Sequence, residues 1–333
     1  MRKILWLILI AALVYSGYWL VGAKGTERAI AGWIAARESE GWQAEYDDLS
    51  TGGFPLRFDT TITALSLAGP ETGVAYNAPR LEFKSASYAP TALSAVFASG
   101  ATFATPLQRI DVSHDRADAD LFVDAGPNLT LDVAAFSLEN VTLTSTLGWG
   151  VTLANGSFNT KRSADNPLTH DIRFSARDFI PNDGLMSALD QDGILSDRFE
   201  TLDIAVTATF DAPWDIHALE GQRPQPTRID IETFAAQWGT LDLQIAGGFD
   251  VDDRGTPTGK VALKARNWRE IIEIATATGL IPVDMKSLAL RAGQVLAGLI
   301  GNADTIDAEL SLSDGMILLG FIPIGPAPSF SIR

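Results

Sequence analysis

The first apolar positions of the chain follow one another without a break. From Ile4 to Val21 no residue is charged, and 10 of these positions are Ile, Leu or Val. Such a run approaches the roughly 20 residues of a helix that spans a bilayer. Arg2 and Lys3 precede it, and basic residues mark the cytoplasmic end of a span. The sequence predicts a membrane anchor over residues 1–24, with the remainder of the chain translocated.

A cleaved signal peptide is the alternative interpretation of this segment. Val21-Gly22-Ala23 has the small residues of a cleavage site. However, the apolar run exceeds the roughly 7 to 15 residues of a signal-peptide core. A retained anchor is therefore favoured, and either outcome places the rest of the chain outside the cytoplasm. We expect a single-pass inner-membrane protein with its C-terminal domain in the periplasm.

A helical spacing of apolar residues comes next. Ile30, Trp33 and Ile34 form one stripe, Thr26 is a candidate N-cap, and Gly41 is a candidate stop. We expect a juxtamembrane helix over residues 25–41, which leads from the membrane to the exported domain.

From residue 42 onward the apolar residues alternate with polar ones. The alternating segments are rich in Thr, Val and Phe and are separated by Gly, Pro, Asn and Asp, as in strands and turns. Alternation gives each sheet one apolar and one wet face, which favours antiparallel pairing. The clearest examples are Leu56–Phe58, Arg80–Phe83, Leu129–Val133, Leu202–Val206, Ile229–Ile231 and Leu241–Ile245.

Helices are few and late in the exported region. One is expected to start at Pro181–Gly184, one to run from a capping-box pattern at Asn267 to about Thr278 with Gly279 as its stop, and one from Asp284 to Ile300 before Gly301. Gly221–Pro226 is the best internal linker. The strand pattern is the same on both sides of it, so residues 42–333 are expected to form one continuous unit.

These patterns predict a mainly β (α+β) fold. We expect a long, curled antiparallel sheet or open half-barrel with a few short helices, preceded by one N-terminal transmembrane helix. No strand-helix-strand rhythm and no Gly-rich phosphate loop is present, so a nucleotide-binding α/β fold is disfavoured.

The charge narrows the range of partners. The formal net charge is −16, and all 41 acidic residues lie beyond Lys24. A surface this negative repels phosphate backbones, so nucleic acid is excluded as a partner. The chain has no cysteine, which excludes disulfides, thiol catalysis and cysteine-ligated metal.

No catalytic, cofactor or metal site is predicted, and we expect a protein that is not an enzyme. His114, His170 and His217 lie far apart in the sequence, and each is interpreted as an exposed or capping residue. Asp250–Gly255 resembles half a calcium loop but lacks the distal Glu, which favours a hairpin turn. The acidic stretch from Asp111 to Asp124 is interpreted as a solvated strand face.

The apolar strand face is the positive signal. A long sheet with few helices either folds onto itself around a filled core or keeps an apolar groove that holds lipid. Sequence alone leaves both open. The candidates for lining a lipid groove are Leu202, Ile204, Val206, Leu241, Leu243 and Ile245.

Short motifs along the chain resemble a known family. They occur in order from the N-terminus to the C-terminus, and most of them are built around turn glycines. They are Gly41-Trp42, Gly53–Phe58, Trp238-Gly239, Gly247-Gly248, Asp253–Gly259, Asn267-Trp268, Asp314-Gly315 and Leu319–Pro328. The set is similar to the alphaproteobacterial proteins called domain of unknown function 2125.

That family looks akin to the AsmA-like envelope proteins, which are membrane-anchored and carry long curled sheets. The resemblance implies lipid binding or transport and cell-envelope maintenance, with a phospholipid or fatty acid as ligand. It carries over no catalytic residue, and this chain is too short to bridge an envelope. The alternative function is a non-catalytic scaffold with a closed β core that contacts other envelope proteins.

Overall fold

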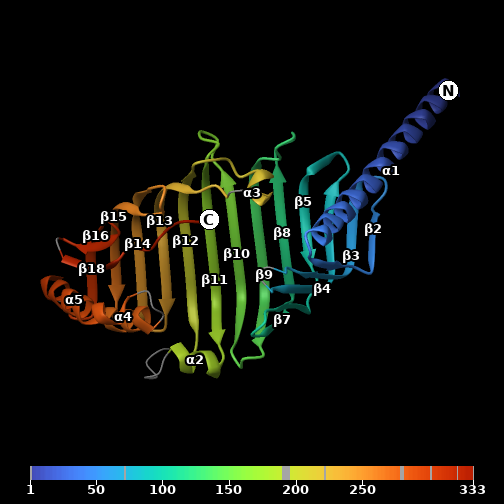
Figure 1. Ribbon diagram of the computed structural model, residues 1–333. Helices are drawn as coiled ribbons and strands as arrows, with labels where there is room; N and C mark the ends of the chain where they lie inside the picture. Colours follow the sequence, from blue (N-terminus) through green and yellow to red (C-terminus); the bar gives the residue numbers. More distant parts are fainter. Residues whose placement is uncertain are drawn as a thin grey trace. The chain divides into compact units, whose positions relative to one another are not determined.

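The computed structural model describes residues 2–70, 73–189, 196–220, 223–277, 281–300, 302–320 and 322–332. It is 53% strand and 22% helix, and the strands form a mostly antiparallel sheet (Figure 1). The mainly β fold with one long apolar N-terminal helix and a few short helices is confirmed. The chain divides into two compact units, the first of residues 1–123 and 141–147 and the second of 124–140 and 148–333.

The N-terminal segment is a single helix, α1 (Arg2–Ser39), drawn in blue in Figure 1. By length and composition it could cross a membrane, as an anchor or a signal sequence does. The prediction that Thr26 begins a second helix is wrong. Thr26 Oγ1 donates to the carbonyl of Gly22 at 3.1 Å, a bond made inside a continuous helix. Gly41, at φ +89°, follows the helix as its predicted stop.

The first unit pairs its strands around β3 (Arg57–Ala68). The Arg57 end of β3 pairs with Ala86, and its Ala68 end pairs with Ala75. The strand has 12 residues, and at about 3.3 Å per residue its two ends lie about 36 Å apart. α1 packs along this sheet through Trp19 and Ala23, which contact Phe58, and through Ile30. The other strands are β1 (Gln43–Glu45), β2 (Asp48–Gly52), β4 (Ala75–Ala86), β5 (Ala89–Phe97), β6 (Ala101–Ala104), β7 (Arg109–Ser113) and β8 (Arg116–Val123).

Strand β9 (Leu131–Ser145) contributes residues to both units. In the second unit, each strand from β10 onward pairs with the next along the chain, as an antiparallel meander. These strands are β10 (Gly150–Arg162), β11 (Thr169–Pro181), β12 (Phe199–Phe210), β13 (Pro226–Trp238), β14 (Leu241–Val251), β15 (Pro257–Arg266), β16 (Thr305–Ser313), β17 (Met316–Leu319) and β18 (Ile322–Pro326).

Three helices of the second unit lie close to the positions predicted, and the short α3 was not predicted. Asn182 Oδ1 accepts from the N–H of Leu185 at 3.0 Å and so caps the first of them. Gly221-Gln222 of the predicted linker, the predicted helix end at Thr278-Gly279, and Gly301 lie outside the described residues. The elements are α2 (Asp183–Leu189), α3 (His217–Glu220), α4 (Trp268–Ala277), the 3-10 turn η1 (Val283–Met285) and α5 (Lys286–Ile300).

The half calcium loop forms the β14–β15 turn, as predicted. Asp252 Oδ1 accepts from the backbone N–H of Arg254 at 2.9 Å and of Thr256 at 2.8 Å. The Thr256 bond, followed by that of Arg254, lowers the pKa of Asp252. Gly255 has φ +82°, the conformation in which a side chain is strained.

The acidic stretch of the first unit is largely paired with neighbouring side chains. Asp111 forms an ion pair with Arg109 and Asp118 with Arg116, while Asp120 accepts from Ser94. These pairs join polar side chains that are close together on the strands, which is the arrangement expected for a polar strand face in contact with solvent.

Candidate functional site

One face of the second unit's sheet is apolar from β10 to β17, and we call it the apolar face. The strand registers align its side chains in rows that run across the strands. One row contains Phe158, Phe174, Ile204, Phe234, Ile245, Leu263 and Ala308, and the row beside it contains Ile172, Val206, Ile231, Val261, Leu310 and Leu319.

The opposite face of the same strands is polar and charged. Arg177 donates to both carboxylate oxygens of Asp203, at 2.7 and 2.9 Å, and Lys260 forms an ion pair with Glu309 at 2.6 Å. These pairs are partly solvated and contribute little to stability. The sheet of the second unit is therefore one-sided, with a wet face and a face that must be covered.

The cover over the apolar face is uneven. α4 and α5 pack over one end of β14 to β16, and the C-terminal segment covers the other end of the same strands. There Phe330 contacts Phe249 with a ring separation of 4.8 Å, and its N–H donates to the carbonyl of Gly255 at 2.9 Å. The middle of β10 to β12 is less covered, since Phe158 is 37% exposed there, whereas Ala208 and Phe210 at one end of β12 are 4% and 6% exposed.

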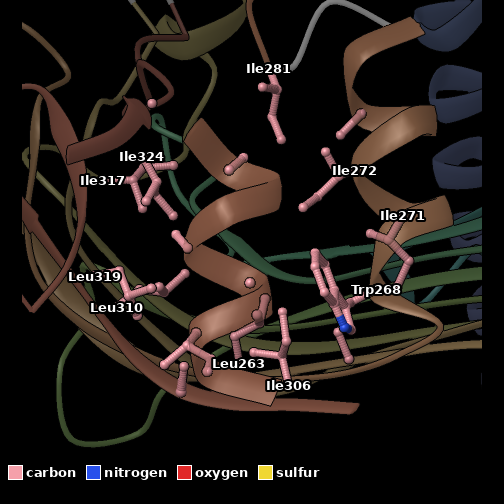
Figure 2. Close-up of a pocket in the computed structure, with 18 of the residues that line it drawn as sticks. Leu263, Trp268, Ile271, Ile272, Ile281, Ile306, Leu310, Ile317, Leu319 and Ile324 are labelled. Atoms are coloured by element: carbon pink, nitrogen blue, oxygen red, sulfur yellow. The ribbon is translucent and has the colours of Figure 1, made fainter. Parts of the chain in front are cut away.

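A pocket lies where α4 and α5 meet the apolar face (Figure 2). Its volume is about 220 Å³. β14 to β17 form its floor, α4 and α5 its walls, and Ile324 of β18 closes one side. The lining residues that the structure describes are all apolar, counting glycine and proline, and they include Leu243, Leu263, Trp268, Ile272, Ala289 and Leu296.

Small side chains on the helices leave this space open. Ala275 of α4 and Ala289 and Ala292 of α5 face the pocket, where Leu at the same positions would fill it. Gly293 of α5 has another role, because an added Cβ would overlap the indole ring of Trp268. α5 therefore lies close to α4 at Trp268, and the two helices leave a space between them at the alanines.

Trp268 anchors one end of the pocket. It is 2% exposed, and its Nε1–H donates to the carbonyl of Ala303 at 3.1 Å. The guanidinium of Arg269 lies 4.4 Å from the ring centroid, on the outer side of the helix, and contacts the same carbonyl at 3.0 Å. At the other side, Lys286 of α5 forms an ion pair with Glu273 of α4. These contacts fix the two helices over the sheet.

The chemistry of the pocket is restricted to apolar contact. Among the residues that the structure describes, its lining contains no carboxylate, imidazole, hydroxyl or ammonium group. Such a lining recognises a hydrocarbon by shape and by exclusion of water.

The six predicted groove residues all lie on the apolar face, in different surroundings. Leu243 lines the pocket. Leu241 is 6% exposed, and Ile245 packs against the cluster around Phe249. Leu202, Ile204 and Val206 of β12 are half-buried on the less covered part of the face. Sequence reasoning missed the pocket walls, although the run of small residues in α5 was visible.

The histidines lie in three different environments. His217 is exposed at the start of α3 and His114 is half-buried. The interpretation of His170 as exposed or capping is wrong, because it is 2% exposed on the apolar face, beside Phe210. Its Nδ1 lies 3.3 Å from Thr160 Oγ1, and desolvation, followed by the charge of Arg162, lowers its pKa.

The family described as "Uncharacterized protein conserved in bacteria (DUF2125)" matches residues 19–328. No curated protein and no solved structure matches the chain. Because the match covers nearly the whole chain, the protein belongs to the DUF2125 family, as its motifs predicted. Kinship with the AsmA-like proteins stays a prediction.

Proposed function

We propose that this DUF2125 protein is anchored in the inner membrane by α1 and binds a lipid acyl chain in its periplasmic domain. The observation that carries the proposal is the pocket beneath α4 and α5, whose described lining residues are all apolar. Lipid binding or transport then serves maintenance of the cell envelope. The ligand class is phospholipid or fatty acid.

The size of the pocket fits the end of an acyl chain. A water molecule takes up about 30 Å³ in the liquid, and a methylene group is of similar size, so about 220 Å³ holds roughly seven methylenes. Burying each methylene contributes about 0.8 kcal/mol, which gives a total of several kcal/mol. The rest of a longer chain would lie along the apolar face, where Ile204 and Phe174 continue the row of Leu263.

The packing of α1 supports a retained anchor over a cleaved signal. The candidate cleavage site, Val21-Gly22-Ala23, lies within a continuous helix, and Ala23 is 2% exposed. Cleavage there would remove Trp19, which is 7% exposed in the core of the first unit. The family match also begins at residue 19, ahead of this site. Arg2 and Lys3 favour a cytoplasmic N-terminus and hence a periplasmic domain.

A photo-crosslinking experiment in native membranes tests the proposal. Cells are fed palmitic acid that carries a diazirine, which enters the membrane phospholipids, and the protein is isolated after irradiation. We expect adducts on peptides of α4 and α5 in addition to adducts on residues 4–14 of α1. The α1 adducts serve as an internal control, because they report contact with the surrounding bilayer.

Two matched variants in α5 identify the pocket as the source of the adducts. Ala289→Leu adds three carbons to the pocket, which leaves less room for an acyl chain, and should reduce the adducts on α4 and α5 while leaving those on α1. Val295→Leu adds one methylene at a position that is 66% exposed and should change neither set. Absence of α4 and α5 adducts in the wild type would leave the pocket as a packing gap, and the scaffold function would then replace lipid binding.

Aspartate substitutions separate the groove from the core. Ile204→Asp lies on the less covered part of the apolar face, so it should reduce acyl adducts on β12 while the domain melts almost normally. Leu243→Asp places an unpaired charge beneath the helices and should unfold the second unit. If both variants unfold equally, the face over β12 is a closed core.

A further inference from the structure

An exposed apolar rim lies at one end of the first unit's sheet. It consists of Phe54, Leu56 and Tyr88, which are 55%, 60% and 77% exposed. Phe54 and Leu56 precede β3 and Tyr88 follows β4, and Arg57 pairs with Ala86, so the three residues share one end of the β3–β4 hairpin. Three large apolar side chains gathered at one end are a surface that water does not favour.

Helix α1 is fastened to this same end of the hairpin. Tyr15 Oη donates to the carbonyl of Pro55 at 3.0 Å, and Tyr18 Oη donates to the carbonyl of Ser87 at 2.6 Å. Trp19 Nε1–H donates to the carbonyl of Arg57 at 2.7 Å. The first contact of the helix with the domain therefore falls at residue 15, within the apolar run.

The length of free helix ahead of that contact is too short for a bilayer. Ile4 to Val14 comprise 11 residues, which extend about 17 Å at 1.5 Å per residue. The hydrocarbon core of a bilayer is about 30 Å thick. If the free residues alone crossed it, over 10 Å of hydrocarbon would remain uncrossed, so the span must continue past Tyr15 to about Val21. The part of the domain bound to residues 15–19 then lies at membrane depth.

We infer that the rim of Phe54, Leu56 and Tyr88 is inserted into the periplasmic leaflet, among the upper parts of the acyl chains. The occupant of this surface is a lipid bilayer, because the rim is continuous with the exposed apolar surface of α1. Two backbone carbonyls beside the rim already have hydrogen-bond donors, as a low-polarity environment requires. The carbonyls of Pro55 and Ser87 are hydrogen-bonded to tyrosine hydroxyls, and Ser87 is 0% exposed.

The inference rests on the proposed anchorage by α1, and the test separates the two. The chain has no cysteine, so single cysteines can be placed in the full-length protein at Leu9, Leu56, Tyr88 and Leu107 and labelled with an environment-sensitive fluorophore. Leu107 is the control, because it is 83% exposed and lies beyond the opposite end of β4, where Ala75 pairs with Ala104. The labelled proteins are reconstituted into vesicles of phosphatidylethanolamine and phosphatidylglycerol.

Quenching by lipids with a spin label near the top of the acyl chain measures depth. We expect the labels at Leu56→Cys and Tyr88→Cys to lose most of their fluorescence and the label at Leu107→Cys to keep it. Leu9→Cys should be quenched best by a spin label deep in the acyl chain. Quenching at Leu9→Cys without quenching at positions 56 and 88 would contradict insertion of the rim and would still support anchorage by α1. Loss of quenching at Leu9→Cys as well would overturn both.

Discussion

Helix α1 of the first unit packs closely on Phe58 of β3, and helix α5 of the second unit packs closely on Trp268 of α4, with different results. Each places a glycine against a buried aromatic ring. An added Cβ on Gly22 of α1 would lie 2.5 Å from Phe58, and one on Gly293 of α5 would overlap Trp268. Around Gly22 the contact continues through Trp19 and Ala23 into a closed cluster. Around Gly293 it gives way to a pocket of about 220 Å³.

The difference comes from the residues beside each glycine. In α1 the neighbouring position is occupied by Trp19, whose ring stacks on Phe58 at 5.9 Å and fills the space. In α5 the neighbouring positions are Ala289 and Ala292, which are too short to reach the floor between the helices. Close approach of a helix to a buried aromatic ring therefore does not by itself produce a filled core. The volume of the adjacent side chains decides whether a cavity remains.

The largest expected effect comes from removing the Trp268 ring, which packs between α4 and α5 at one end of the pocket. Trp268→Ala should destabilise the second unit by about 3 to 5 kcal/mol, because it deletes a side chain that is 2% exposed and enlarges an existing cavity. Urea unfolding in detergent measures the change. Trp33→Ala in α1, at a position 49% exposed, is the control and should cost less than about 1 kcal/mol. Equal costs would mean that Trp268 does not anchor the pocket.

Adding volume should separate the closed region from the open one. Ala23→Leu forces a branched side chain into the contact with Phe58 and should cost about 1 to 3 kcal/mol. Ala289→Leu enters the pocket and should change stability by less than about 1 kcal/mol in either direction. Thermal melts of both variants give the comparison. A loss at Ala289→Leu as large as at Ala23→Leu would contradict a cavity under α5.

Glycine substitutions test the shared feature of the two helices, and each helix supplies its own control. Gly22→Ala and Gly293→Ala should each cost about 1 to 3 kcal/mol, because the ring in contact must move. Gly32→Ala in α1 and Gly298→Ala in α5 have no heavy atom within 4 Å of the new Cβ. Both should gain up to about 1 kcal/mol from helix propensity. Stabilisation by all four changes would show that neither ring contact is tight.

The smallest effect concerns His170, on the apolar face away from the pocket. Its pKa is lowered from 6.5, so the folded protein holds it neutral where the unfolded chain takes up a proton. Its contribution to stability is present above pH 6.5 and is lost as pH falls below that value, by at most about 1.4 kcal/mol per pH unit. Urea midpoints at pH 7.5 and 5.5 should differ less in His170→Gln than in the wild type. His217→Gln, at an exposed site, should behave as the wild type does.

Much of the fold follows from local patterns in the sequence. Alternation at Leu202–Val206 and Leu241–Ile245 placed strands β12 and β14, and the glycines at 41 and 255 marked a helix end and a turn. These elements were predictable because side-chain period and positive φ are properties of a few neighbouring residues. The same reasoning failed at Thr26, where a residue suited to capping lies inside a helix that continues to Ser39.

By itself the sequence determined the apolar helix, the one-sided strands and the family. Only the tertiary structure showed which part of the apolar face is covered by helices. It also showed that α5 leaves a pocket beside Trp268 and that His170 is buried. The reason is that alternation tells which way a side chain points but not what lies opposite it. Covering and cavity volume depend on side chains from α4, α5 and five strands, which meet only when the chain has folded.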